Sequence, residues 1–342
     1  KSSSATASFS PMCFRVKLPG HAADCGRCVP PVKLNSMRIC SLLPSATEIL
    51  FSLGLEDSVM GVTHECDFPP AASKKPALIQ PRLDPTAPAA VINQRVSEMI
   101  QRGESIYAVR DDLLREIEPD LIITQDLCHV CAASPDDLAT ALSKLKKQPR
   151  ILMLAPHKLA DVWDDILRVG SVTGTENAAD SLAQKLRAEV EAIRAATNSS
   201  RARPRVACIE WLDPLFNAGH WVPEMVECAG GIDVLAKAGK PSVRITSEDV
   251  IAAQPDVIVV MPCGYDASRA ANEFRSTAFP QTWRDLPAVR NDSVFAVDAN
   301  SYFSRSGPRL AQGVAILAKI FHSDLINSEA PAISCEHITT AA

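Results

Sequence analysis

Residues 38–54 read RICSLLPSATEILFSLG, and this order predicts a buried strand, a tight polar turn and a helix in direct succession. Pro44 stops the apolar run of the strand, and Ser45 with Glu48 three residues later matches the S-x-x-E capping box of a helix start. Gly54 predicts the end of that helix. A strand that leads into a helix N-terminus presents free backbone N–H groups at the carboxyl edge of a sheet, where α/β proteins bind ligands. The stretch therefore predicts one wall of a ligand site.

Short apolar segments and helical segments alternate along most of the chain, which is typical of parallel sheets covered by helices on both faces. We expect residues 71–90, rich in Pro and Ala, to form a surface loop, and residues 108–117 to form a helix. Residues 177–197 contain no Gly or Pro and predict one helix of about 30 Å at 1.5 Å per residue.

The chain also contains an internal repeat. Residues 112–124 (DLLREIEPDLIIT) match residues 248–260 (EDVIAAQPDVIVV), with Pro119 and Pro255 lying 136 positions apart. Each copy runs from an acidic residue through a helix and a Pro-Asp pair to an apolar strand. The repeat predicts an α/β fold of two similar lobes with parallel sheets, joined by the long helix, with a ligand cleft between the lobes.

The predicted domain organisation has five segments. They are a leader (1–36), an N-terminal α/β lobe (37–156), a connecting helix (157–203), a C-terminal α/β lobe (204–322) and a disordered tail (323–342). The leader is Ser- and Pro-rich, with five basic residues against one acidic residue, which is typical of an organellar transit peptide or of a disordered extension. No secretory signal is visible. We therefore expect a soluble cytoplasmic or organellar protein rather than a periplasmic one.

Composition excludes several function classes. A net charge of −5 argues against a nucleic-acid partner, and no apolar run approaches the roughly 20 residues of a membrane helix. No nucleophile elbow, phosphate-binding glycine loop or H-E-x-x-H motif is present, so we expect no enzyme, with a hydrolase or transferase as the weakest alternative.

His and Cys residues gather in the loops that follow predicted strands. Two Cys separated by two residues, in the sequence CHVC, have the spacing that lets two thiolates bind one zinc or iron ion. The alternatives are that these Cys pack as small side chains or form a disulfide, and that the His side chains cap turns. The candidate metal ligands are His64, Cys66, Cys128, His129, Cys131 and His220.

Seven segments in order resemble one known family. They are RICSLLPSATEILFSLG, GVTHECDFPP, EIEPDLIIT, the long helix, DPLFNAGHWVPEMVECAGG, SEDVIAAQPDVIVV and DANSYFSRSGPRL. Together they resemble the cobalamin- and iron-siderophore-binding substrate-binding proteins, with the nearest likeness to the cobalamin-binding members, over residues 37–321. The resemblance implies two Rossmann-like lobes on a helical backbone, a ligand in the cleft, delivery to an ABC permease, and no catalysis.

The resemblance also implies site residues. Trp221, Tyr302 and Phe303 would cover the flat face of the ligand, with His220 or His64 near its metal. Asp112 (or Asp111) and Glu248, which are equivalent in the repeat, would dock the lobes onto permease arginines. The implied ligand contacts are Ser45, Ala46, His64, Glu65, Cys66, Asp67, Phe68, Phe216, Gly219, His220, Trp221, Tyr302, Phe303 and Arg305.

We thus expect a monomeric binding protein for a corrinoid such as cobalamin, or for a similar metal chelate, that requires no cofactor. The alternative is a protein that binds free zinc or iron through loop His and Cys ligands.

Overall fold

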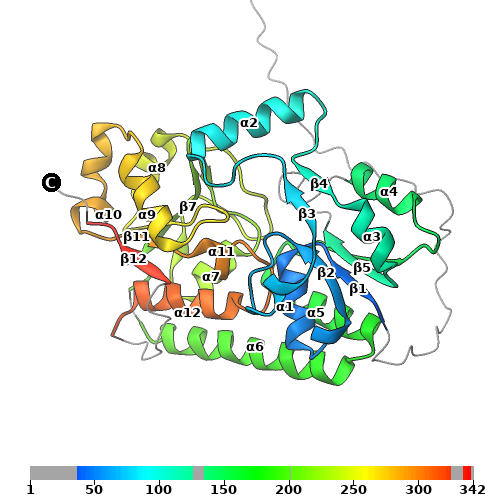
Figure 1. Ribbon diagram of the computed structural model, residues 1–342. Helices are drawn as coiled ribbons and strands as arrows, with labels where there is room; N and C mark the ends of the chain where they lie inside the picture. Colours follow the sequence, from blue (N-terminus) through cyan, green and yellow to red (C-terminus); the bar gives the residue numbers. More distant parts are fainter. Residues whose placement is uncertain (1–36, 126–134, 201, 325–333, 340–342) are drawn as a thin grey trace, which may run out of the picture. The chain divides into compact units, whose positions relative to one another are not determined.

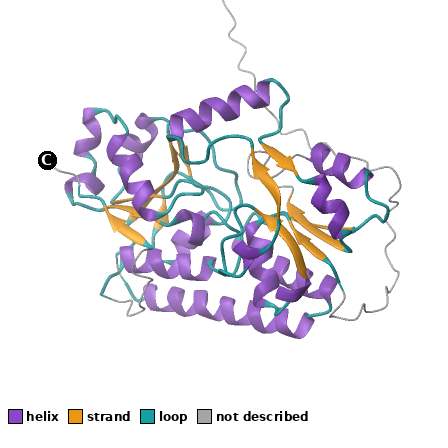
Figure 2. Cartoon of the chain, in the orientation of Figure 1, coloured by secondary structure: helices purple, strands orange, loops and turns teal. Residues whose placement is uncertain are grey.

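Two six-stranded sheets organise the residues that the computed structural model describes, namely 37–125, 135–200, 202–324 and 334–339 (Figure 1). We call the sheet of strands β1–β6 with its helices the N-lobe, and the sheet of strands β7–β12 with its helices the C-lobe. Figure 2 shows the strands of each sheet between flanking helices. The α/β prediction with parallel sheets is confirmed.

The N-lobe sheet has the order β4-β3-β2-β1-β5-β6, and all its neighbouring strands run parallel except β3 and β4. Its strands are β1 (Ile39–Ser41), β2 (Val59–Thr63), β3 (Ala77–Pro81), β4 (Tyr107–Val109), β5 (Leu121–Gln125) and β6 (Arg150–Leu154). Its helices are α1 (Pro44–Ser52), α2 (Ala89–Gln101), α3 (Asp111–Ile117) and α4 (Pro135–Ser143), with short 3-10 helices η2 (Glu56–Ser58) and η3 (Ala72–Lys74). The expected surface loop at 71–90 therefore contains strand β3, and the expected helix at 108–117 begins only at Asp111, after the antiparallel edge strand β4.

The C-lobe sheet has the order β12-β11-β10-β7-β8, with β9 pairing beside β7; β8 and β12 are antiparallel to their neighbours. Its strands are β7 (Arg205–Leu212), β8 (Leu215–Asn217), β9 (Ile232–Asp233), β10 (Val257–Val260), β11 (Val294–Val297) and β12 (Cys335–His337). Its helices are α7 (Val222–Cys228), α8 (Ser247–Ala253), α9 (Ala267–Ser276), η4 (Gln281–Asp285), α10 (Pro287–Arg290), α11 (Ala299–Tyr302) and α12 (Leu310–Phe321). The expected disordered tail is wrong at β12, which hydrogen-bonds along β11.

The internal repeat has one local structure in both copies. Glu118 and Gln254 end helices α3 and α8 with positive φ values of 46° and 43°. The aspartate two residues later accepts a backbone N–H at the start of the neighbouring strand: Asp120 from Arg38, just before β1, at 3.0 Å, and Asp256 from Arg205, the first residue of β7, at 2.9 Å. Each Pro-Asp pair thus ends a helix and fixes a central parallel strand beside the first strand of its lobe.

Helices α5 (Leu159–Thr173) and α6 (Glu176–Thr197) connect the lobes and pack closely against each other. A Cβ added at Gly170 would lie 2.4 Å from Ala179 Cβ, so only glycine permits this approach of the two helices. One hydrophobic core includes Ile49 of α1, Ile166 of α5 and Leu317 of α12. Figure 1 shows α6 below both sheets, and its contacts with α7 and α12 continue that core into the C-lobe. Among the described helices none is long and apolar enough to cross a membrane.

Asp165 is a buried carboxylate in this connecting region. Its Oδ1 accepts a hydrogen bond from Arg168 at 2.7 Å, whereas no hydrogen bond to its Oδ2 is found in the described part of the chain. Burial raises the pKa of Asp165 to about 6, although Arg168 opposes the shift. A carboxyl group whose pKa rises on folding destabilises the fold when it is ionised. The cost is absent below the ordinary pKa near 3.8 and complete above about 6.

We therefore expect Asp165→Asn to raise the free energy of unfolding at pH 8 by about 1–3 kcal/mol, and by less at pH 5, because a shift of about two pKa units corresponds to ~3 kcal/mol at most. Urea denaturation at both pH values measures this difference. The matched control is Asp164→Asn, since the Asp164 side chain is 64% exposed and should change stability by less than about 1 kcal/mol. A gain that does not grow with pH would contradict the buried-charge explanation.

Candidate functional site

The loops that follow β2 and β11 meet across the two lobes in a cluster of charged side chains. The Arg305 guanidinium donates to both carboxylate oxygens of Asp67, at 2.5 and 3.1 Å, and to the Glu65 carbonyl at 2.9 Å. Asn300 accepts from Arg305 at 2.9 Å and donates to Asp67 at 3.2 Å. Because these loops lie at the carboxyl ends of parallel strands, the carboxyl edges of the two sheets face each other here.

Glu48 extends the same cluster beneath the surface. Its carboxylate accepts from Arg309 at 2.6 and 3.0 Å and from Arg305 at 3.4 Å, and its side chain is only 2% exposed. The predicted capping box is therefore wrong: Pro44 occupies the first turn, Leu43 is the N-cap residue without a side-chain cap, and Glu48 faces the C-lobe. We call Glu48, Asp67, Asn300, Arg305 and Arg309 the interlobe ion cluster.

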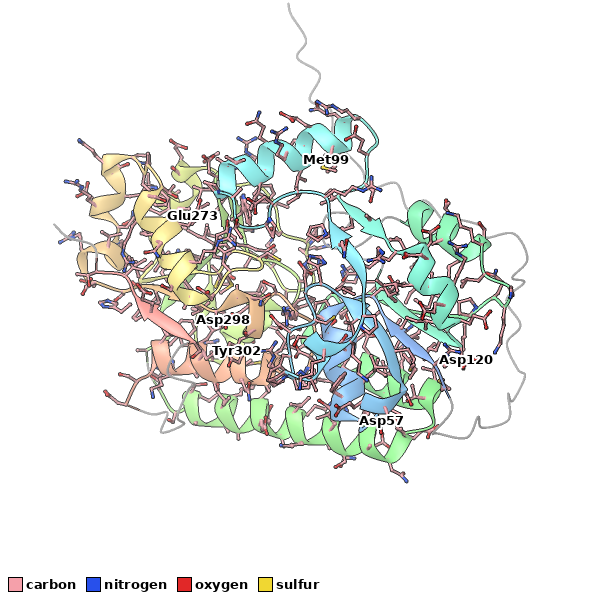
Figure 3. The ribbon with its side chains drawn as sticks, viewed as in Figure 1. Asp57, Met99, Asp120, Glu273, Asp298 and Tyr302 are labelled. Atoms are coloured by element: carbon pink, nitrogen blue, oxygen red, sulfur yellow. The ribbon has the colours of Figure 1, made fainter. Side chains whose placement is uncertain are left out.

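Within the interlobe ion cluster, Asp67 and Arg305 stabilise the charged forms of each other. Burial opposes ionisation of Asp67, but the hydrogen bonds and charge of Arg305 outweigh it and hold the pKa of Asp67 below its usual range. Burial likewise opposes the charge of Arg305, but the effect of Asp67 and Glu48 is larger and holds the pKa of Arg305 above its usual value. Arg309 also lies over the Phe68 ring, with its guanidinium carbon 4.3 Å from the ring centroid. Figure 3 labels Asp298 and Tyr302, which lie at the two ends of the short helix α11 that precedes Arg305.

A second contact joins the start of α5 to the start of α7. Glu224 accepts the Leu159 N–H at 2.7 Å, which satisfies a free donor at the N-terminus of α5. The His157 and His220 rings stack with centroids 5.8 Å apart, and burial, with His157 nearby, lowers the pKa of His220. His220 has a φ of 53°, and its N–H donates to the Lys240 carbonyl at 2.6 Å. The loop around His220 is thus fixed by backbone contacts.

A third contact attaches the segment before α2 to the C-lobe. The Ala89 N–H donates to Glu273 at 3.0 Å, and Arg269 donates to the Ala87 carbonyl at 3.0 Å. A hollow of about 560 Å³ lies at this contact, between residues 86–88 and one face of α9. Figure 3 shows Glu273 beneath the N-terminal end of α2.

Two of the three rings that were predicted to cover the ligand are buried in the core. Trp221 is 6% exposed and Phe303 is 2% exposed, and both belong to the main hydrophobic core. The Trp221 Nε1–H donates to the Phe303 carbonyl at 2.8 Å, which fixes α7 to the segment after β11. Tyr302 remains half-buried beside Arg309. Trp211 and Tyr107 are also half-buried, and neither was predicted as a ligand contact.

The other predicted contacts fall into two groups. His64, Glu65, Asp67 and Phe68 lie together at the end of β2, and Ser45 lies 3.4 Å from Ser306 between their hydroxyl oxygens. Ala46 and Cys66 lie in the core, and Phe216 and Gly219 lie in and after β8, where Phe216 bridges to Arg244. Asp112 and Glu248 are exposed at the starts of α3 and α8, and Arg110 lowers the pKa of Asp112 to about 2.

The described residues offer no cluster of three or more His, Cys, Asp or Glu arranged to hold a metal ion. Cys66 is 2% exposed, and burial raises the pKa of its thiol while Thr47 and Thr63 contact the sulfur at 3.1 and 3.4 Å. A buried neutral thiol is a poor ligand. The candidates Cys128, His129 and Cys131 lie outside the described residues.

A hydrogen bond through Nδ1 orients the His64 ring. Its Nδ1 lies 3.1 Å from the Ile79 carbonyl oxygen, which can only accept a hydrogen bond, so Nδ1 is the donor of this bond. Nε2 is the other ring nitrogen and lies 3.9 Å from Glu65 Oε1. The Tyr107 ring lies 5.8 Å from the imidazole and holds it from one side. A neutral imidazole oriented through Nδ1 can bind iron or cobalt through Nε2.

Residues 39–301 match the model of the periplasmic binding protein family, so the chain belongs to this family. The chain is 25% identical over 300 residues to the uncharacterised ABC transporter substrate-binding lipoprotein YvrC of Bacillus subtilis, covering 86% of this chain and 82% of YvrC. It is 22% identical over 288 residues to the vitamin B12-binding protein of Vibrio parahaemolyticus, covering 84% and 90% of the two chains. Among solved structures, the periplasmic haem-binding protein RhuT of Roseiflexus, in its apo form, matches with a TM-score of 0.63 and 25% identity, over 84% of this chain and 98% of RhuT.

Two predictions are decided by these relatives. Proteins of this family bind solutes and do not catalyse reactions, which confirms that the chain is a binding protein and not an enzyme. The predicted cytoplasmic or organellar location is wrong, because the family and its relatives are periplasmic proteins or lipoproteins of ABC transporters. The prediction depended on residues 1–36, whose composition does not identify the compartment.

Proposed function

We propose that this protein binds a flat metal chelate, a corrinoid such as cobalamin or a haem, between its lobes. Two of the relatives named above are a vitamin B12-binding protein and a haem-binding protein. The carboxyl edges of the two sheets face each other, and α/β proteins bind ligands at such edges. The observation that carries the proposal is the orientation of His64, because its Nδ1 bonds the Ile79 carbonyl and leaves Nε2, at the end of β2, as the nitrogen that can bind a metal. Trp211 and Tyr107 supply aromatic surface for the macrocycle.

The test is a titration of the purified protein with haemin and with aquacobalamin, followed by visible absorbance. We expect saturable binding of at least one chelate, with the spectral change that follows imidazole coordination of its metal. In His64→Ala the coordination spectrum should be lost, with affinity at least about tenfold weaker, a loss of ~1.4 kcal/mol.

The control is His337→Ala, because His337 lies on edge strand β12 and bonds the Asp292 carbonyl. Zinc and ferric salts are titrated in parallel to test the free-metal alternative. No spectral change with either chelate at about 100 μM, a concentration far above the affinities of useful binding proteins, would exclude the proposal.

We also propose that the bound chelate is delivered to an ABC permease. The support is the repeat, which presents Asp112 and Glu248 at equivalent exposed positions on the two lobes, and the relative YvrC, which is named an ABC transporter protein. Two acidic side chains at equivalent places suit a partner with one basic site for each lobe.

A further inference from the structure

Helix α2 lies in the connection between strands β3 and β4 of the N-lobe and stands apart from the hydrophobic cores of the described chain. The connection from β3 to β4 is closed at its base by the Arg82 N–H, which donates to the Ile106 carbonyl at 2.8 Å. Of the 13 residues of α2 only Ala89 is buried. None of the three hydrophobic cores found in the described chain includes a side chain from the rest of this helix. A helix that contributes so little to folding needs another reason to be amphipathic.

The apolar residues of α2 lie on one face at helical spacing. Ile92, Val96 and Met99 are separated by four and three positions, which places them in one stripe, and each is half-buried. Val91 and Ile100, which lie off this stripe, are 44% and 54% exposed. The stripe therefore faces the rest of the protein, but the protein covers it only in part.

The N-terminal end of α2 is fastened to the opposite lobe. The Ala89 N–H bonds Glu273, and the Ala87 carbonyl accepts from Arg269, whose guanidinium carbon lies 3.6 Å from the centroid of the Tyr265 ring. The helix also contacts β7, the strand that carries Trp211 near its carboxyl end. Trp211 packs edge-on against Tyr265, with ring centroids 5.7 Å apart. Figure 1 shows α2 above the loops between the two sheets.

We infer that α2 is a lid that covers the bound chelate, with Ile92, Val96 and Met99 as ligand contacts; this rests on the proposed function. An apolar stripe on a helix that contacts the strand carrying Trp211 matches the apolar surface of a macrocycle and excludes water from it. The Glu273 and Arg269 bonds hold the lid closed. In the part of the chain that the structure describes, two hydrogen bonds and a limited contact with β7 attach the lid to the C-lobe, so the lid opens without disturbing the shared core.

The test compares a lid-face variant, Ile92→Ser/Val96→Ser/Met99→Ser, with a matched control, Val91→Ser/Ile100→Ser, which removes apolar side chains from the same helix outside the stripe. Haemin and aquacobalamin are the probes, and stopped-flow absorbance gives the association and dissociation rate constants. We expect the lid-face variant to release the chelate about 10- to 100-fold faster and the control to stay within about twofold of the unmodified protein. Thermal unfolding checks that both variants fold.

A second variant, Glu273→Gln, tests the fastening without touching the stripe. It should speed dissociation about threefold to tenfold, because a neutral amide binds the Ala89 N–H more weakly than a carboxylate does. Equal dissociation rates in the lid-face variant and its control overturn the lid while the proposed function stands. Failure of the unmodified protein to bind either probe overturns both.

Discussion

Replacing Glu48 by alanine is expected to lower the free energy of unfolding by about 3–5 kcal/mol. The Glu48 side chain is 2% exposed and is the shared acceptor for Arg309 and Arg305, whose side chains are 11% and 7% exposed. Removing the carboxylate leaves two nearly buried guanidinium groups with less negative charge, and Arg309 loses both of its bonds to Glu48. Removal of one partner from a buried charge pair costs far more than the pair itself contributes.

Urea denaturation with linear extrapolation measures this loss. The matched control is Glu65→Ala, because the Glu65 side chain is 44% exposed and lies 3.9 Å from His64 Nε2, so its removal should cost less than about 1 kcal/mol. The double variant Glu48→Ala/Arg309→Met should recover part of the loss, since it also removes one of the charges left unpaired. Equal stabilities of the Glu48 and Glu65 variants would show that the interlobe ion cluster does not hold the lobes together.

The fold was predicted well where the signal is local. The Pro-Asp pairs ending at Asp120 and Asp256 mark a helix end and a strand start within a few residues, and both copies fold as expected. Strands β3 and β12 were missed because their evidence is tertiary. Strand β3 lies in a Pro-rich segment and is identified by pairing with β2 and β4, while β12 is identified by pairing with β11, far away in sequence.

The candidate site was predicted less well, because a loop sequence does not tell which side chains turn inward. Trp221 and Phe303 lie in ligand-loop segments, yet both turn into the core that α7 and α12 complete. Arg309 was missed although it lies in the quoted segment DANSYFSRSGPRL, since its partner Glu48 is 261 positions away. Glu48 in the first helix and the two arginines before α12 can be recognised as partners only when the two lobes are placed beside each other.

The largest expected effect on the His220 loop is that of Gly219→Ala. A Cβ at this position would lie 2.2 Å from the Ser242 nitrogen, 2.7 Å from the Pro241 carbonyl carbon and 2.9 Å from the Lys240 oxygen. All three are backbone atoms, so no side-chain rotation relieves the overlap and the segment at 240–242 must move. The same segment accepts the His220 N–H through Lys240, and that bond would be disturbed with it.

We expect Gly219→Ala to lower the free energy of unfolding by about 2–4 kcal/mol, at or above the usual cost of overpacking, because the backbone rather than a flexible side chain must yield. Thermal and urea unfolding measure the loss. Gly307→Ala is the control: a Cβ there meets Glu48 and Ser45 at ordinary contact distances of 3.5 Å, so the change should stay below about 1 kcal/mol. If both variants unfold alike, the close approach at Gly219 does not constrain the loop. A loss of stability in Gly219→Ala alone instead means that the loop around His220 packs against residues 240–242 only because position 219 is glycine. The same packing holds His220 against His157, just before the start of α5.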